Sequence, residues 1–187
     1  MKSEFDIKLT VRDMYRFSMY HTYSGIHGGA SVVIAVLVFF VAAKTYGGVE
    51  TMYTLLYILF GILFLLYMPV SLYLRAKRQI LSSEVFKEAL HFTVTEEKIT
   101  SSQKGEKADL PWEQIYKVVE TKSNILVYSS RINAFVLPKD QMGGEYDNFR
   151  GILKEKLPSY RLKLKKKKKK KDCRPYTKHF PGRKRRN

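Results

Sequence analysis

The chain has 187 residues, with 34 Lys or Arg against 17 Asp or Glu, which gives a formal net charge of +17. Most of that charge lies in residues 161–187, which hold 15 Lys or Arg and one acid, Asp172, so that the first 160 residues carry only +3. A body this weakly basic argues against a nucleic-acid-binding domain. The single cysteine, Cys173, excludes an intrachain disulfide and a zinc site built on paired cysteines.

Residues 1–23 are predicted to form a β-strand followed by a short helix at a membrane interface. Apolar residues occupy every second position of the strand: Phe5, Ile7, Leu9 and Val11. This period of two is typical of a half-buried strand. Thr10 and Asp13 resemble a helix capping box. Because a lone strand is not stable in water, it is expected to pair with strands later in the chain.

Two uncharged apolar segments follow, over residues 24–43 and 52–74, joined by a Gly-rich loop over residues 44–51. About 20 apolar residues in an α-helix span a hydrocarbon core of about 30 Å, so both segments are predicted transmembrane helices. Basic residues follow the second segment directly: Arg75, Lys77 and Arg78. Others precede the first segment, and this positive-inside asymmetry predicts both termini in the cytoplasm and the loop outside.

Two alternatives for these segments stay open. They could form a buried helix pair in a soluble protein, although the remaining chain is too small to cover them. The first could be a cleaved signal peptide ending near Ala43, although about 30 residues precede its apolar run, which is long for an n-region. Pro69 predicts a kink in the second segment. Neither segment contains a charged residue, which favours an anchor over a transport pathway.

Residues 75–160 are predicted to form a cytoplasmic domain. A helical stretch continues to about Glu88, and strand patterns then recur at 8 to 12 residue spacing, as in a small antiparallel sandwich or barrel. An apolar stripe predicts a C-terminal helix from Tyr146 to Leu157. The expected fold is α+β: a transmembrane hairpin inserted after the first strand of a pleckstrin-homology-like small β-barrel or sandwich with a C-terminal helix.

Several motifs resemble the YcxB-like proteins of bacteria. They are Leu9-Thr10-x-x-Asp13, Phe92-Thr93-Val94-Thr95-Glu96-Glu97, Leu110-x-Trp112-x-x-Ile115-x-Lys117-Val118-x-Glu120-Thr121 and Phe135-Val136-Leu137-Pro138-Lys139. The resemblance covers roughly residues 4 to 157, and the Trp and the Leu-Pro-Lys motif are its most specific parts. It implies a multi-pass protein of the bacterial plasma (inner) membrane with a cytoplasmic C-terminal domain, and it implies no particular activity.

The sequence contains no Gly-rich phosphate loop, nucleophile elbow or zinc motif, so we predict no enzyme, no cofactor and no metal site. The one tryptophan, Trp112, is expected to anchor a core rather than to form a ligand platform. Tyr128, Arg131 and Lys139 are weak candidates for a binding surface.

Residues 161–187 are predicted to be a disordered polybasic tail, because a run of seven lysines repels itself. An anionic leaflet attracts such a segment by about 1 kcal/mol per basic residue. The candidate contacts to anionic lipid are therefore Arg75, Lys77, Arg78, Lys165, Lys166, Lys167, Lys168, Lys169, Lys170 and Lys171. Residues 172–187 show no periodicity, so an out-of-frame extension is an alternative to a genuine tail.

The functional prediction is a membrane-tethered cytoplasmic module that binds a protein partner or lipid headgroups. The alternative is an accessory subunit of a transporter or membrane enzyme that associates through small residues of its first span: Gly25, Gly28, Gly29 and Ala30. The expected partners are the bilayer, anionic lipids and a membrane protein, with nucleic acid disfavoured. The ligand, the physiological process and the oligomeric state stay open at this point.

Overall fold

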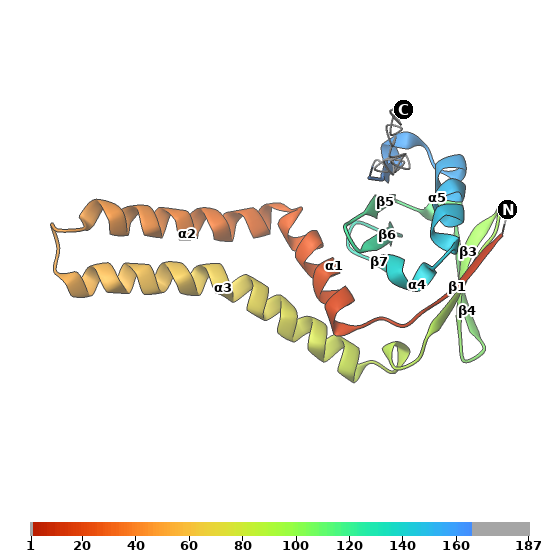
Figure 1. Ribbon diagram of the computed structural model, residues 1–187, viewed down its shortest axis with the longest axis horizontal. Coiled ribbons are helices and arrows are strands. Elements are labelled where there is room, and N and C mark those ends of the chain that lie inside the picture. Colours follow the sequence, from red (N-terminus) through yellow and green to blue (C-terminus); the bar gives the residue numbers. More distant parts are fainter. Residues whose placement is uncertain (1, 166–187) are drawn as a thin grey trace, which may run out of the picture.

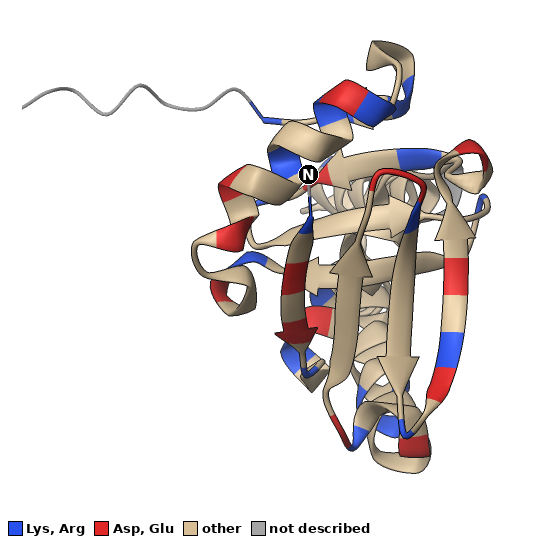
Figure 2. Ribbon diagram, turned by 90° about the vertical axis from the view of Figure 1, so that its right-hand side faces the viewer, with Lys and Arg blue, Asp and Glu red and all other residues tan. Residues whose placement is uncertain are grey.

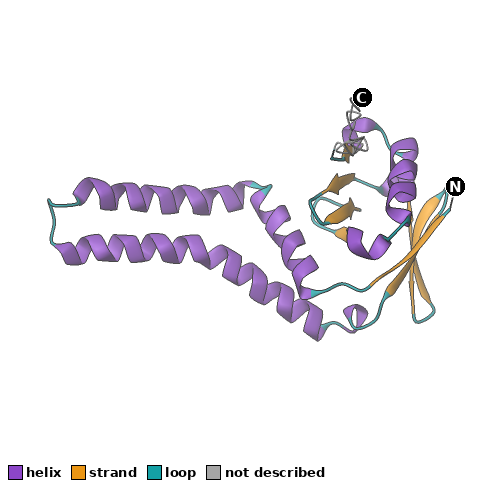
Figure 3. Cartoon of the chain, viewed as in Figure 1, coloured by secondary structure: helices purple, strands orange, loops and turns teal. Residues whose placement is uncertain are grey.

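The computed structural model describes residues 2–165, which form an α+β molecule with a hairpin of two long helices and two four-stranded sheets (Figures 1 and 3). Its helices and strands, in chain order, are β1 (Ser3–Ile7), α1 (Val11–Tyr23), α2 (Ile26–Thr45), α3 (Thr51–Ser82), β2 (Leu90–Val94), β3 (Lys98–Gln103), β4 (Glu106–Pro111), β5 (Lys117–Glu120), β6 (Asn124–Tyr128), β7 (Ala134–Pro138), α4 (Lys139–Met142), α5 (Glu145–Lys156) and β8 (Leu162–Lys163). Short 3-10 turns lie at Glu84–Phe86, Trp112–Gln114 and Ser159–Arg161.

The first sheet joins the start of the chain to the residues that follow the hairpin. Its strand order is β1-β2-β3-β4, and all neighbours are antiparallel. Phe5 of β1 pairs with Phe92 of β2, so the predicted pairing of the N-terminal strand across the inserted hairpin is confirmed. The strand ends at Ile7 rather than at Val11. Thr10 caps α1 instead, and its side chain and that of Asp13 form the predicted capping box.

The outer strands of the first sheet carry charge. Glu4 and Asp6 alternate with buried residues on β1, and Glu106, Lys107 and Asp109 lie exposed on β4. In Figure 2 these charged positions mark the outer strands, while the two central strands are almost free of charge. Charged residues on edge strands discourage pairing with another chain. This sheet is therefore protected against growth at either edge.

The second sheet has the order β7-β6-β5-β8 and contains one parallel pair. Two expectations were wrong here. The sheet is not wholly antiparallel, and the predicted disordered tail does not begin at residue 161, because Leu162 pairs with Val118 and Lys163 with Val119. The open edge of β5 gives the backbone of this segment hydrogen-bonding partners that water would otherwise supply. The tail prediction for residues 166–187, including the alternative for 172–187, lies outside the described residues.

Both faces of the second sheet are covered, so every residue of β6 is buried. Ile125 and Val127 face the main core, which the first sheet and α5 complete with Phe92 and Phe149. Leu126 and Tyr128 face the other way, into a second cluster that includes Phe17 and Tyr20 of α1. A fully buried side chain of this size contributes about 1.5–3 kcal/mol, so α1 is held firmly on the sheet.

The helix α3 is longer than the predicted second span. That span was expected to end at residue 74, with a helical stretch to about Glu88, whereas α3 runs unbroken to Ser82 before the 3-10 turn. Pro69 lies inside it, and the helix axis changes direction about halfway along (Figure 1). A proline lacks the backbone donor and clashes with the preceding turn, which accounts for the predicted bend. Beyond the bend, α3 packs against α1, where Tyr15 meets Tyr73 edge to face at 5.7 Å.

Candidate functional site

The hairpin carries its large apolar side chains on the outside. The helical segments Gly28–Thr45 and Thr51–Ser82 are long and apolar enough to cross a membrane, and only 17% and 6% of their apolar windows are buried inside the structure. A core helix of a soluble protein would bury most of such a segment. The two helices are therefore not the core of a domain within residues 2–165.

Small residues mark the places where the hairpin packs against itself. A Cβ built on Gly61 of α3 would lie 2.6 Å from the ring of Phe39 on α2, so this glycine lets the two helices approach. A Cβ on Gly28 would lie 2.7 Å from the carbonyl oxygen of Thr22, at the corner between α1 and α2. Gly28, predicted as a contact for another protein, is thus used inside the chain. Gly29 has open space around its Cβ position.

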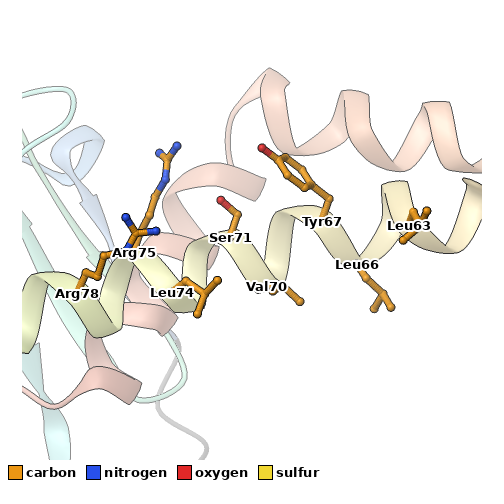
Figure 4. A pocket seen from close by; sticks show the side chains of 8 residues that line it. All are labelled: Leu63, Leu66, Tyr67, Val70, Ser71, Leu74, Arg75 and Arg78. Carbon is orange, nitrogen blue, oxygen red and sulfur yellow. The ribbon is translucent and has the colours of Figure 1, made fainter.

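A groove of about 580 Å³ runs along one face of α3 (Figure 4). Its lining residues recur at intervals of three or four, which places them on one side of a helix: Leu63, Leu66, Tyr67, Val70, Ser71, Leu74, Arg75 and Arg78. At about 100° per residue, Pro69 lies on the opposite side. A proline lacks the backbone donor and clashes with the turn before it, which bends the helix at this point. The groove therefore lies along the part of α3 that contains the predicted kink.

The groove has an apolar part and a cationic end. In Figure 4, Leu66 and Val70 line one edge, and Tyr67 and Ser71 line the other. Arg75 and Arg78 close the end that lies toward the β domain. None of the ion pairs within residues 2–165 involves either arginine, so their guanidinium groups are available to an anion.

The structure brings together only part of the predicted lipid-contact set. Arg75 and Arg78 line the groove, whereas Lys77 is exposed and does not line it. Lys165 follows β8 at the edge of the second sheet, and its backbone N–H donates to Glu120 at 3.0 Å. The remaining lysines, 166–171, lie outside the described residues.

A buried ionic cluster around Glu120 was missed by the sequence analysis. The Glu120 side chain is 4% exposed and accepts hydrogen bonds from Lys139 Nζ at 2.6 Å and from the Tyr146 hydroxyl at 2.7 Å. Arg150 lies 3.5 Å away and donates to the carbonyl oxygen of Lys165. The cluster therefore joins β5, α4, α5 and the segment after β8. The sequence did contain one sign of this cluster. Glu120 directly follows Val118-Val119, so an acidic residue falls within a strand whose pattern predicts burial.

The pKa of Glu120 reflects both its burial and the hydrogen bonds that its carboxylate accepts. Burial raises the pKa of Glu120, but the hydrogen bonds from Lys139 and Tyr146 lower it by more, so its pKa lies below the ordinary value of 4.5. Burial and the bond to Glu120 raise the pKa of Tyr146 to about 12. Glu120 accepts two hydrogen bonds at Oε1 and one at Oε2, and no group of three His, Cys, Asp or Glu in residues 2–165 could hold a metal ion. We assign the cluster a structural role.

The other singled-out residues are not gathered into one site. Trp112 is buried and donates from Nε1 to the carbonyl oxygen of Thr95 at 3.2 Å, which confirms the core assignment. Lys139 belongs to the Glu120 cluster. Tyr128 is buried against α1, and Arg131 lies exposed in the β6–β7 loop. The expected surface of Tyr128, Arg131 and Lys139 was therefore wrong.

Residues 94–153, from the end of β2 into α5, match the protein-family model described as YcxB-like protein. This segment is YcxB-like. The resemblance predicted from the motifs is thereby confirmed over these residues, which include Trp112, Glu120 and Lys139. No curated protein and no solved structure matched the chain. The YcxB-like segment supplies most of the main core and most of the Glu120 cluster, while the hairpin and the groove on α3 lie outside it.

Proposed function

We propose that this protein is a two-helix membrane anchor that holds an interaction domain at the cytoplasmic surface and binds anionic lipid at the groove of α3. The observation that carries the proposal is the hairpin surface, which is apolar along its length and ends in two arginines without ion-pair partners in residues 2–165. Such a surface is stable in hydrocarbon, with cations at the level of the headgroups.

The helix lengths support a spanning arrangement. With 20 residues, α2 is about 30 Å long, which equals the thickness of a hydrocarbon core. With 32 residues, α3 is about 48 Å long and extends beyond that core on one side. Arg75 lies about 36 Å along α3 from Thr51, which places Arg75 and Arg78 among the headgroups when the loop end lies at the opposite surface. Both termini and the β domain then share the cytoplasmic side.

The groove matches the two parts of an anionic phospholipid. An acyl chain would lie along Leu63, Leu66 and Val70, where apolar side chains continue the surface of the span. The phosphate would meet Arg75 and Arg78, whose guanidinium groups donate in pairs to phosphate oxygens. The Ser71 hydroxyl adds a donor between these two parts.

The β domain is the second component of the proposed module. Two four-stranded sheets with a helix after the seventh strand resemble the order of a pleckstrin-homology-like domain, and we propose that likeness on this order alone. A domain of this kind would bind a protein partner or lipid headgroups. An accessory subunit of a membrane complex is the second candidate, which is favoured by the open space beside Gly29 on α2.

Lipid binding at the groove is tested by neutralising Arg75 and Arg78 together and, in a separate variant, the neighbouring Lys77. The purified protein is inserted in nanodiscs of mixed phosphatidylcholine and phosphatidylglycerol, and the bound lipid is counted by native mass spectrometry. Arg75→Gln combined with Arg78→Gln should lower the preference for phosphatidylglycerol by about thirtyfold, since two basic residues at about 1 kcal/mol each contribute about 2 kcal/mol. Lys77→Gln removes one charge from the same helix at a position that does not line the groove, and should lower the preference by no more than about fivefold, the general contribution of one basic residue near an anionic surface. Equal losses in both variants would refute the groove as the binding site.

A further inference from the structure

We propose that one end of the second sheet forms a further membrane-contact surface, which binds anionic lipid headgroups of the leaflet that the hairpin enters. We call it the sheet-end surface and define it by six residues: Tyr116, Lys117, Arg131, Ile132, Tyr160 and Arg161. The inference rests on the proposed membrane anchor and extends it from the helices to the β domain.

The helix α1 fixes which end of the sheet faces the hairpin. Near its start, the carbonyl oxygen of Asp13 accepts a hydrogen bond from Asn124, the first residue of β6, at 3.5 Å. Near its end, the ring of His21 stacks on that of Tyr128, the last residue of β6, at 6.2 Å. The helix therefore runs along β6 toward Tyr128. Since α2 begins at Ile26, just after α1 ends, the Tyr128 end of the sheet is turned toward the hairpin (Figure 1).

The strand pairings bring the six residues to this end. Tyr128 pairs with Lys117 of β5 on one side and with Ala134 of β7 on the other. The β6–β7 loop, residues 129–133, therefore projects there, and it contains Arg131 and Ile132. Because β8 runs parallel to β5, the residues just before it, Tyr160 and Arg161, lie beside the start of β5. A hollow of about 480 Å³ is lined by residues from three of these segments: Glu113, Gln114, Tyr116, Lys117, Ser129, Tyr160 and Arg161.

The exposed apolar side chains of the β domain are concentrated at this end. Between residues 90 and 165, the large hydrophobic side chains that are exposed are Tyr116 at 48%, Ile132 at 68% and Tyr160 at 79%. All three belong to the sheet-end surface. Tyrosine is enriched where a protein meets the membrane–water interface, because its ring is apolar and its hydroxyl is polar. Two exposed tyrosines and one exposed isoleucine at the same end indicate a surface that meets an amphiphilic medium.

The cations of the surface are interleaved with the aromatic rings. Lys117 Nζ lies 5.6 Å from the ring centre of Tyr116 and 4.6 Å from that of Tyr128. The Arg161 guanidinium lies 5.8 Å from the ring of Tyr160 and donates to the carbonyl oxygen of Ile115 at 3.0 Å. The ion pairs within residues 2–165 involve neither of these cations nor Arg131.

The charge balance favours an anionic occupant. Glu113 is the one acid that lines the hollow, so Lys117 and Arg161 exceed it by one charge, and Arg131 on the β6–β7 loop adds another cation at this end. Anionic headgroups would pair with these cations while Tyr116, Ile132 and Tyr160 sit at the boundary of the acyl chains. The bilayer is favoured over a protein partner because α1 runs toward the Tyr128 end of β6 and leads directly into α2, so this end of the sheet faces the hairpin.

The test measures depth at three single cysteines, each introduced into a Cys173→Ser protein: Ser129→Cys beside the surface, Lys107→Cys on β4, and Leu37→Cys in α2. Each carries an environment-sensitive fluorophore, and the protein is placed in nanodiscs of phosphatidylcholine with or without phosphatidylglycerol. We expect the label at position 129 to be protected from an aqueous quencher and quenched by headgroup-labelled lipid, more strongly with phosphatidylglycerol. The label at 107 should stay in water, and the label at 37 should lie in hydrocarbon.

The three positions separate the two proposals. If position 37 lies in hydrocarbon but position 129 is as accessible to water as position 107, the sheet-end surface is refuted while the anchor stands. If position 37 is itself in water, both proposals fall. Lys117→Gln combined with Arg131→Gln should remove the dependence on phosphatidylglycerol at position 129, and the same change at Lys107 and Lys122 should preserve it. Protection that needs a protein from the native membrane, and does not occur in nanodiscs, would also overturn the inference.

Discussion

The hairpin and the β domain use similar apolar residues in opposite ways. In the β domain, Ile7, Leu126 and Phe149 are at most 1% exposed, whereas Leu37 and Phe40 in the hairpin are each 58% exposed. Burial from water is what stabilises the first group, at about 25 cal/mol for each Å² of apolar surface. The second group gains nothing of this kind from the chain itself. The two regions therefore differ in what covers their apolar side chains: the chain itself in the β domain and, in the proposed function, lipid around the hairpin.

The helix α1 connects these regions and belongs to both. Its Phe17 and Tyr20 complete the cluster on the outer face of the second sheet, and its Tyr15 meets Tyr73 of α3. The orientation of the β domain relative to the hairpin is thus set by side-chain packing on two faces of one helix. Substitutions inside and outside each region should therefore have different effects on stability and on membrane insertion.

Glu120→Gln should have the largest effect, because it breaks the interior of the β domain. The amide nitrogen would oppose the donors of Arg150 and Lys165, and removing one partner of a buried ion pair costs about 3–5 kcal/mol. Chemical denaturation in detergent measures this loss. Glu113→Gln removes an exposed acid outside the cluster and should change stability little. A Glu120→Gln protein as stable as the native one would show that the cluster contributes nothing.

Leu37→Arg should disturb the exterior of the hairpin. An arginine at the centre of a span disfavours insertion by about 2.5–3.5 kcal/mol, which glycosylation mapping of microsomal insertion measures. Val85→Arg makes the same change at an exposed position outside the long helices, and insertion should not respond. If the two variants insert equally well, the hairpin is not in hydrocarbon, and its apolar surface needs another explanation.

Gly61→Val should disturb the interior of the hairpin. Its Cβ would lie 2.6 Å from the Phe39 ring, so the helices must separate or the ring must move, at about 1–3 kcal/mol. Thermal unfolding in detergent should detect this change, and Phe39→Leu in the same protein should restore part of the stability. Gly29→Val, which meets no atom within 4 Å, provides the control. Equal behaviour of Gly61→Val and Gly29→Val would contradict the packing of α2 on α3.

Replacing two surface glycines of the β domain by alanine should change the stability of the protein in opposite directions. Gly105 adopts φ +87° in the β3–β4 turn, so Gly105→Ala should cost about 1 kcal/mol. Gly151 lies in α5 with open space around its Cβ position, so Gly151→Ala should stabilise the protein by about 0.5–1 kcal/mol. Paired unfolding curves at one pH compare them. A shift of the same sign in both variants would be inconsistent with the backbone conformation of the turn.

The acid side of the pH–stability profile should depend on Glu120. Its pKa is lowered in the folded state, so its contribution is present above the unfolded pKa near 4.5 and is lost as the pH falls through the folded value. The native protein should therefore lose stability more steeply below pH 4.5 than Glu120→Gln does. Parallel slopes in unfolding curves measured at successive pH values would show that another group governs acid unfolding.

The sequence predicts those parts of the fold that depend on local pattern. The strand alternation around Phe92, the stripe of α5 and the turn that contains Gly105 all arise from periods or turn residues within one segment. The pairing of β1 with β2 could also be inferred, because an isolated strand before a hairpin has no other partner in the chain. The apolar hairpin and its bend at Pro69 follow from composition and from a single residue.

The remainder depends on contacts between distant residues, which no local pattern encodes. The strand β8 has two residues and exists because the edge of β5 is open. In the Glu120 cluster, the hydrogen-bond donors come from residues 139, 146 and 165. The sequence around each of these residues does not indicate that they meet. The groove on α3 is lined by Arg75 and Arg78 but not by Lys77, although spacing alone would place Lys77 near Val70 and Leu74 on the helix.

The central claim is that the hairpin crosses a membrane and leaves the β domain on one side with both chain ends. In a Cys173→Ser background, Gly47→Cys in the loop and Lys107→Cys in the domain are treated with a membrane-impermeant maleimide on intact cells and again after permeabilisation. The account predicts labelling at position 47 in intact cells and labelling at position 107 only after permeabilisation. Labelling of both positions, or of neither, before permeabilisation would contradict it.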